Sequence, residues 1–330
     1  MPTLTSAHDL ITAIPFLIGF HPTNSIVLIS VKDGAIGLAM RLDLPTQLES
    51  DQIDLLAHHF LRDESEAALL VAYMPEKRDD GDSILISLGA GLIRNGVEIQ
   101  ESIVVQDGRY RSIICRDAAC CPPSGKSMPD IDASEIAVEH VIAGIPMPYE
   151  NISQLIETIS ADPSSLTLAW ASEVSSFGFT DEDPNALPLR RDGVETMDLL
   201  LDDFRMGYGA TNRTLVARMI GRMGDLHVRD YAMGVHTEDS YDLYFMMWRE
   251  LLRLAPIGFV APIACIVAAM AYEGGDGALA QKALDRALAD DEHYPLASLL
   301  RRVFNAGWPP ESFAAMRAEL HPKVIASIFE

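Results

Sequence analysis

Basic residues are scarce in this chain of 330 residues. Lys and Arg together number 25 against 48 Asp and Glu, which gives a formal net charge of −23. A surface field of this sign repels phosphate backbones and anionic lipid headgroups. The imbalance therefore excludes generic nucleic-acid binding and attachment to a membrane surface. We expect a protein partner or a small ligand instead, and the sequence leaves the oligomeric state open.

The chain also lacks a long, unbroken hydrophobic run. The uncharged stretch Leu254–Tyr272 contains Pro256, Gly258 and Pro262. A bilayer span needs about 20 apolar residues, and a helix beginning at Pro262 keeps only about a dozen of them. The N-terminus has no Lys or Arg before Lys32, so it lacks the basic start of a secretory signal. These features predict a cytoplasmic protein with no transmembrane segment.

Cysteine is rare, and its distribution is uneven. Four cysteines are too few for a disulfide scaffold in a chain of this size, which favours reduced thiols. Three of them, Cys115, Cys120 and Cys121, lie within seven residues and directly precede Pro122-Pro123. Such a concentration of thiols is the main candidate site in the sequence.

The cysteine group has three interpretations. Thiolates are soft ligands that select zinc, and His21, in a loop after the first predicted helix, is the most attractive fourth ligand. Alternatively, Cys120 or Cys121 with a lowered pKa is a nucleophile and His21 is its base. The third interpretation is a tight turn that packs small, inert thiols. The sequence leaves all three open.

Two Asp-Gly dipeptides organise the first half of the chain. Asp33-Gly34 and Asp107-Gly108 each lie between β-branched, apolar runs, and a two-residue hairpin turn needs the positive φ that Asp and Gly tolerate. The four strands predicted in this way are Ser25–Lys32, Ala35–Asp43, Val97–Gln106 and Arg109–Cys115.

Helices and a central strand fill the space between these hairpins. Ser6 and Asp9 form a capping-box pattern, and apolar residues then recur at helical spacing until the loop 19–24. The continuous apolar run Ala67–Met74 predicts a buried central strand. The other predicted helices are 53–61, Ser83–Asn95 and Ser134–Ala143. This order predicts an α/β domain with a mixed sheet over residues 1–148, which ends at Pro146 and Pro148.

Strand signals nearly vanish after that boundary, and residues 149–330 predict an all-α domain. The helices are expected at Val194–Arg205, Thr211–Met223, Ser240–Leu254, Pro262–Glu273, Ala278–Ala289, Leu296–Asn305 and Glu311–Leu320. The segment from Gly275 to Leu288 is typical of the turn and second helix of a tetratricopeptide-like repeat. A layer of antiparallel helical hairpins is therefore expected.

Complete nucleotide-binding and calcium-binding motifs are missing, and other binding candidates are few. Ser124–Ser127 lacks the first glycine of a phosphate-binding loop. Arg218 and Arg222 lie one helical turn apart in a segment rich in arginine. These arginines are either paired with neighbouring acidic residues or available to an anionic ligand. These two arginines and Asn24 are the candidate ligand-binding residues.

Several of these segments together resemble an actinobacterial family known as domain of unknown function 4192. They are Ile14-Pro-Phe-Leu-Ile-Gly-Phe-His-Pro-Thr-Asn-Ser25, Arg41-Leu-Asp-Leu-Pro45, Asp107-Gly-Arg-Tyr110, Cys115-x4-Cys-Cys-Pro-Pro-Ser-Gly125, Val228-Arg-Asp-Tyr231 and Gly275-Asp-Gly-Ala-Leu-Ala280. The resemblance covers nearly the whole chain and implies no activity, cofactor or catalytic residue.

Function must therefore be argued from the residues themselves. Because no catalytic motif is complete and stacked helix pairs commonly present binding surfaces, we expect a non-enzymatic adaptor that binds a protein or a ligand. The alternative is a small-molecule hydrolase or transferase that uses His21 and a thiol of Cys120 or Cys121. A cavity that contains both His21 and one of these cysteines would favour the enzyme.

Overall fold

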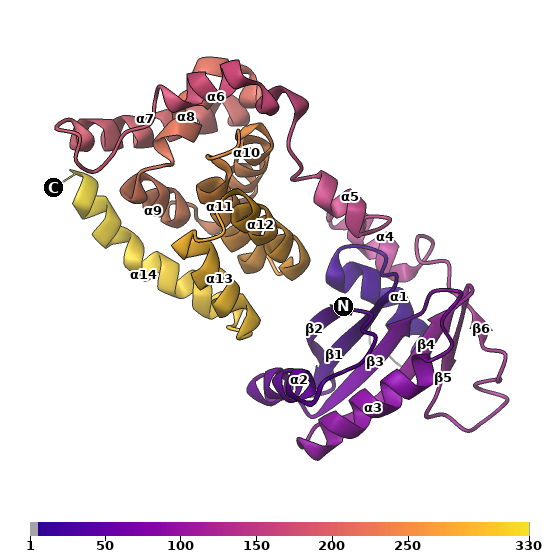
Figure 1. The fold of residues 1–330 in the computed structure, drawn as a ribbon. Coiled ribbons are helices and arrows are strands. Elements are labelled where there is room, and N and C mark those ends of the chain that lie inside the picture. Colours follow the sequence, from indigo (N-terminus) through magenta and orange to yellow (C-terminus); the bar gives the residue numbers. More distant parts are fainter. Residues whose placement is uncertain (1–5, 330) are drawn as a thin grey trace. The chain divides into compact units, whose positions relative to one another are not determined.

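The computed structural model describes residues 6–329 and separates the chain into two compact units, residues 1–154 and 155–330. The first holds a mixed six-stranded sheet with helices, and the second is helical (Figure 1). This confirms the predicted fold class. The division between the units falls inside helix α5 (Ile152–Glu157).

The sheet of the first unit has the strand order β2-β1-β3-β4-β5-β6. The strands are β1 (Ser25–Lys32), β2 (Ala35–Asp43), β3 (Ala67–Tyr73), β4 (Glu98–Gln106), β5 (Arg109–Ser112) and β6 (Lys126–Ser127). Strands β3 and β4 are parallel, and the other neighbouring pairs are antiparallel. As predicted, β3 lies inside the sheet and every one of its residues is buried.

Both predicted hairpin turns are present. Asp33 and Gly34 have φ of 51° and 72°, and Asp107 and Gly108 have φ of 52° and 69°. The turns join β1 to β2 and β4 to β5 in antiparallel pairs. Positive φ at both central positions matches the twist of the flanking strands, which explains why Asp-Gly predicted these hairpins correctly.

Helices cover both faces of the sheet (Figure 1). Helices α2 (Ser50–Arg62) and α3 (Gly81–Arg94) pack on one face, and α1 (Ala7–Ile18) packs on the other. Ser6 caps α1 by accepting a hydrogen bond of 3.2 Å from the Asp9 amide. Gly19 ends α1 in the left-handed conformation, with φ of 81°. Helix α4 (Glu135–Ile142) follows the sheet.

The second unit is a set of packed helices. They are α6 (Leu168–Ser175), α7 (Ala186–Arg205), α8 (Arg213–Arg222), α9 (Leu226–Gly234), α10 (Tyr241–Leu254), α11 (Val260–Glu273), α12 (Gly277–Asp290), α13 (Pro295–Asn305) and α14 (Pro310–Phe329), with short 3-10 turns at Pro163–Leu166, Gly209–Thr211 and Glu238–Ser240. Helix α11 is buried on all sides from Val260 to Ala271. It belongs to the run considered above as a membrane span, and no described helix is long and apolar enough to cross a bilayer.

Several predicted elements need correction. Strand β5 ends at Ser112 rather than Cys115, because the Ser112 hydroxyl accepts hydrogen bonds from the amides of Ile114 (3.2 Å) and Cys115 (3.0 Å) and turns the chain. Helix α14 continues past Leu320 to Phe329 and contains Pro322. Helix α7 begins at Ala186, eight residues before the predicted Val194. Helices α5, α6 and α9 were not predicted, although Asp225 caps α9 by accepting hydrogen bonds from two backbone amides.

Candidate functional site

A cavity of about 510 Å³ lies in the first unit at the carboxyl ends of the parallel strands β3 and β4. The loop 21–24 frames it, because β1 pairs antiparallel with β3 and Ser25 therefore lies opposite Tyr73. A crevice outside the carboxyl ends of parallel strands is the usual ligand position in α/β sheets. Its volume is also in the range of small-molecule sites.

Backbone hydrogen bonds hold the framing loop at both ends. The His21 amide donates to the Tyr149 carbonyl (2.9 Å), and the Tyr149 amide donates to the Gly19 carbonyl (2.9 Å). At the other end the Leu44 amide donates to the Asn24 carbonyl (3.0 Å). Asn24 itself has φ of 47°, which Asn tolerates better than most residues. The loop is therefore preorganised beside the cavity.

The opposite wall, the segment after β3, is also fixed. The Gln106 side-chain amide donates to the carbonyls of Pro75 (3.0 Å) and Arg78 (2.6 Å). Arg78 in turn donates to the Pro45 carbonyl (3.0 Å) and pairs with Asp80. These contacts join the ends of β3 and β4 into one rigid wall.

The lining combines apolar surface with a few polar groups. Glu76 and Asp107 are exposed acids at its edge, and no Lys or Arg is found among the lining residues that the structure describes. The Tyr73 hydroxyl is buried and has no hydrogen-bond partner among the described residues. Burial raises the pKa of Tyr73 above its usual value, so this hydroxyl stays protonated. The cavity thus offers negatively charged hydrogen-bond acceptors and one hydroxyl that has no partner among the described residues.

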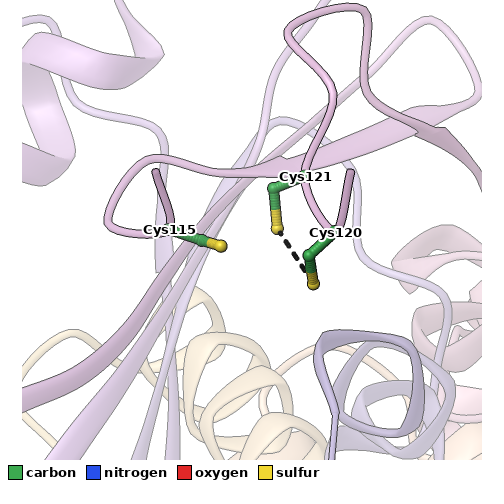
Figure 2. A group of neighbouring side chains, drawn as sticks. All are labelled: Cys115, Cys120 and Cys121. Atoms are coloured by element: carbon green, nitrogen blue, oxygen red, sulfur yellow. Dashed lines mark hydrogen bonds between the residues drawn. The ribbon is translucent and has the colours of Figure 1, made fainter. Parts of the chain in front are cut away.

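The three clustered cysteines lie together elsewhere in the same unit. The sulfur atoms of Cys115, Cys120 and Cys121 are all within 4.8 Å of one another. The distance between the sulfurs of Cys120 and Cys121 is 3.8 Å (Figure 2). Figure 2 shows the side chains directed toward a common space from two parts of one loop. The fold therefore brings these predicted residues into one group.

The protonation state of Cys121 argues against this residue as the nucleophile. Partial burial, together with hydrogen bonding of the protonated Cys121 thiol to the sulfurs of Cys115 and Cys120, raises the pKa of Cys121 to about 12. A reactive cysteine instead needs a lowered pKa, since the thiolate is the nucleophile. In the metal-free protein the Cys121 thiol is therefore protonated at neutral pH.

The structure places His21 at the cavity and not in the cysteine group. His21 lines the cavity, whereas no cysteine does. Among the described residues, no hydrogen bond joins His21 to a thiol, and its ring nitrogens are not part of the cysteine group. The physical reason is the β4–β5 hairpin, which turns the chain back from the cavity before the cysteine loop begins. Among the described residues, the structure therefore shows no contact that would make His21 a fourth ligand of this group or a base for its thiols.

Arg218 and Arg222 of the helical unit have internal partners. The Arg222 Nε atom lies 2.8 Å from the Asp192 carboxylate, and Arg222 also donates to the Phe177 carbonyl. Arg218 lies 3.4 Å from the other oxygen of Asp192. Arg222 is buried, so its charge is used to join α8 to α7. These pairs favour a structural role for both arginines over an anion site.

Of the predicted residues, the structure thus places His21 and Asn24 at the cavity. It also places Tyr73, Glu76 and Asp107 there, and these were not singled out from the sequence. They occupy or follow the ends of two predicted strands with a predicted helix between them. A helix that connects two neighbouring strands implies that the strands are parallel. Parallel strands end at the same edge of the sheet, and this reasoning could have pointed to Tyr73, Glu76 and Asp107 as site residues.

A mixed α/β unit with a cavity at the ends of its parallel strands, followed by a helical unit, defines the class of this protein. The chain belongs to the family described as Domain of unknown function (DUF4192), whose model matches residues 8–311. Comparison with curated proteins gives no match, and neither does comparison with solved structures.

Proposed function

We propose that this protein is a non-enzymatic, cytoplasmic binding protein whose first unit takes up a small neutral or positively charged organic molecule. The observation that carries the proposal is the cavity at the ends of β3 and β4, with its framing loop held in place by the backbone. Preorganised walls reduce the ordering cost of binding, which favours affinity for a small ligand.

The groups around the cavity support binding more than catalysis. The enzyme hypothesis needs a thiol beside His21, and the cysteines form a separate group. Thr23 also lines the cavity and carries a hydroxyl, but no hydrogen bond joins it to His21 among the residues that the structure describes. The imidazole, the Asn24 amide and the Tyr73 hydroxyl are suited to fix a ligand through hydrogen bonds.

The charge of the lining selects the class of ligand. Glu76 and Asp107 are carboxylates at its edge, and no described lining residue is a Lys or Arg to compensate them. The whole chain has a net charge of −23. An anionic ligand such as a nucleotide would therefore meet repulsion on approach and in the site, whereas a cation would be attracted.

This selectivity can be tested with cationic, neutral and anionic fragments of similar size, using ligand-observed NMR on the full chain. We expect the wild-type protein to bind cationic and neutral fragments in preference to anionic ones. The double substitution E76Q/D107N should weaken the binding of cationic fragments about 5- to 10-fold. The reason is that two exposed charge interactions together contribute roughly 1 kcal/mol or slightly more to the binding free energy. Binding of neutral fragments should be unchanged.

The matched control is Asp33→Asn, which alters the equivalent turn position of the other hairpin, outside the cavity. Asn tolerates positive φ at both turns, so neither variant should disturb the fold. If E76Q/D107N binds cationic fragments as wild type does, or if anionic fragments bind best, the proposed ligand class is rejected.

A further inference from the structure

We infer that Cys115, Cys120 and Cys121 bind one zinc ion through three thiolates, with the fourth coordination position left to water or another exogenous ligand. The inference is independent of the proposed cavity function. It concerns a different part of the first unit and makes no use of His21.

The spacing of the sulfur atoms carries the inference. Zinc–thiolate bonds are about 2.3 Å long, and two such bonds at a tetrahedral angle place their sulfurs about 3.8 Å apart. The sulfurs of Cys120 and Cys121 are 3.8 Å apart, and all three sulfurs fall within 4.8 Å. The spacing of these adjacent cysteines in the sequence differs from that of a zinc knuckle. Even so, the distance between their sulfurs equals the distance between two sulfur ligands of a tetrahedral zinc ion. A disulfide needs sulfurs about 2.05 Å apart, which is far closer.

The loop is built by its own hydrogen bonds, so the sulfurs converge before any metal arrives. Ser112 turns the chain at Cys115, as described above. Asp117 then returns it, since its carbonyl accepts from the Cys121 amide (2.7 Å) and its carboxylate accepts from the Ala119 amide (2.9 Å). A metal would bind here with little further ordering of the backbone.

The far side of the loop is fastened to β5. Arg109 donates to the carbonyls of Ser124 and Gly125, each at 2.6 Å. Gly125 has φ of 71°, and a Cβ atom there would lie 2.9 Å from the Tyr110 carbonyl oxygen. A glycine is therefore required where the loop rejoins the sheet, which explains its place after Cys-Cys-Pro-Pro-Ser.

The three donor atoms suit a thiophilic dication. No described His, Asp or Glu ligand atom joins the three sulfurs, so the donor set is purely thiolate and favours zinc over the oxygen-seeking magnesium and calcium. Each thiol loses its proton to solvent as its sulfur bonds to the metal. Three thiolates and one Zn²⁺ leave a net charge of −1, and no electron transfer is involved.

The test uses the full chain, purified without a histidine tag under reducing conditions and stripped by a chelator. Titration with Co²⁺ should reach one equivalent and give thiolate-to-cobalt charge transfer together with intense tetrahedral d–d bands, which Zn²⁺ then removes. Zinc binding should release protons into a weakly buffered solution. Replacing Cys115, Cys120 or Cys121 with Ser should weaken zinc binding at least about 100-fold, the upper end of the effects seen for residues that only orient ligands.

Cys265→Ser is the matched control, because Cys265 is buried in helix α11 of the other unit. It should bind cobalt and zinc as wild type does. Circular dichroism of each apo variant separates loss of a ligand from loss of the fold, and Cys→Asp, which keeps an anionic ligand, should restore weak binding. The inference is overturned if reduced, folded wild-type protein gives no thiolate–cobalt bands, or if the three serine variants bind zinc like the control.

Discussion

Replacing Glu273 with Ala is expected to cost the helical unit about 3–5 kcal/mol of folding free energy, the range found when one partner of a buried ion pair is removed. Glu273 lies at the end of α11, and its two oxygens have different partners. The Arg317 Nε atom donates to one at 2.7 Å, and the His236 Nε2 atom lies 3.1 Å from the other. The exposed fractions of these side chains are 7% for Glu273, 10% for Arg317 and 2% for His236.

The large effect follows from what alanine leaves behind. Arg317 comes from α14 and also donates to the Gly234 carbonyl (2.9 Å), so it cannot move to solvent without giving up a second contact. Its buried guanidinium would keep its charge but lose its carboxylate. The contacts of Glu273 with Arg317 and His236 therefore form a buried polar connection between α14 and the rest of the helical unit. Arg191 of α7 holds the end of α14 separately, by donating to the carbonyls of Ile328 and Phe329. The Ala variant should therefore loosen α14 near Arg317.

Tryptophan fluorescence measures this loss in one unit only. Trp170, Trp248 and Trp308 all lie in residues 155–330. Denaturant unfolding followed by their emission therefore reports the helical unit without a contribution from the sheet. Glu292→Ala is the control, because its side chain is 82% exposed and a surface change there should stay within about 0.5 kcal/mol. A loss below 1 kcal/mol in Glu273→Ala would show that the buried pair does not stabilise the unit.

The contacts of Glu273 also show that the folded helical unit extends beyond the residues matched by the family model. The family match ends at residue 311, near the start of α14. Yet Arg317 and Phe313 pack into the unit, and Phe313 is buried against Tyr272 and Phe304. Helix α14 is thus part of the folded unit although most of it lies outside the matched range.

Local signals predicted the fold well because each rested on a backbone requirement. Asp33-Gly34 and Asp107-Gly108 determined the hairpins through positive φ, and Ser6 determined the start of α1 through its side-chain acceptor. Strands β1 and β2 have the predicted bounds for the same reason. Where one side chain overrode the pattern, as Ser112 does at the end of β5, the prediction was wrong by three residues.

The candidate site was predictable only in part, because it depends on which strand ends share an edge. His21 and Cys121 both follow elements of the first unit, and their positions along the chain gave no measure of their separation. The order of strands decides it: His21 leads into β1, beside the end of β3, whereas the cysteines follow β5 after the hairpin has reversed the chain. Tyr73 went unnoticed because its place in a continuous apolar run indicates core packing rather than a site.

Replacing Tyr73 with Phe is expected to stabilise the first unit by about 1–3 kcal/mol, because the buried Tyr73 hydroxyl has no hydrogen-bond partner among the described residues and its desolvation is uncompensated. Hydrogen exchange followed by mass spectrometry of β1 and β3 peptides measures the gain within this unit. Tyr208→Phe, whose side chain is exposed in the other unit, should change nothing. The Tyr73 hydroxyl lies on the wall of the cavity and is suited to donate a hydrogen bond to a ligand. The Phe variant should therefore also bind neutral fragments more weakly than wild type.

The same substitution has a signature in alkaline solution. Burial raises the pKa of Tyr73 in the folded state above that of about 10 in the unfolded chain. The folded protein therefore holds this proton more tightly, and its contribution to stability is complete below pH 10 and is lost as the pH rises above it, by about 1.4 kcal/mol per pH unit. Tyr73→Phe should remove that component, so its advantage over wild type should grow above pH 10. An advantage that stays constant or shrinks there, or a variant less stable than wild type at neutral pH, would mean that the Tyr73 hydroxyl already has a partner in solution.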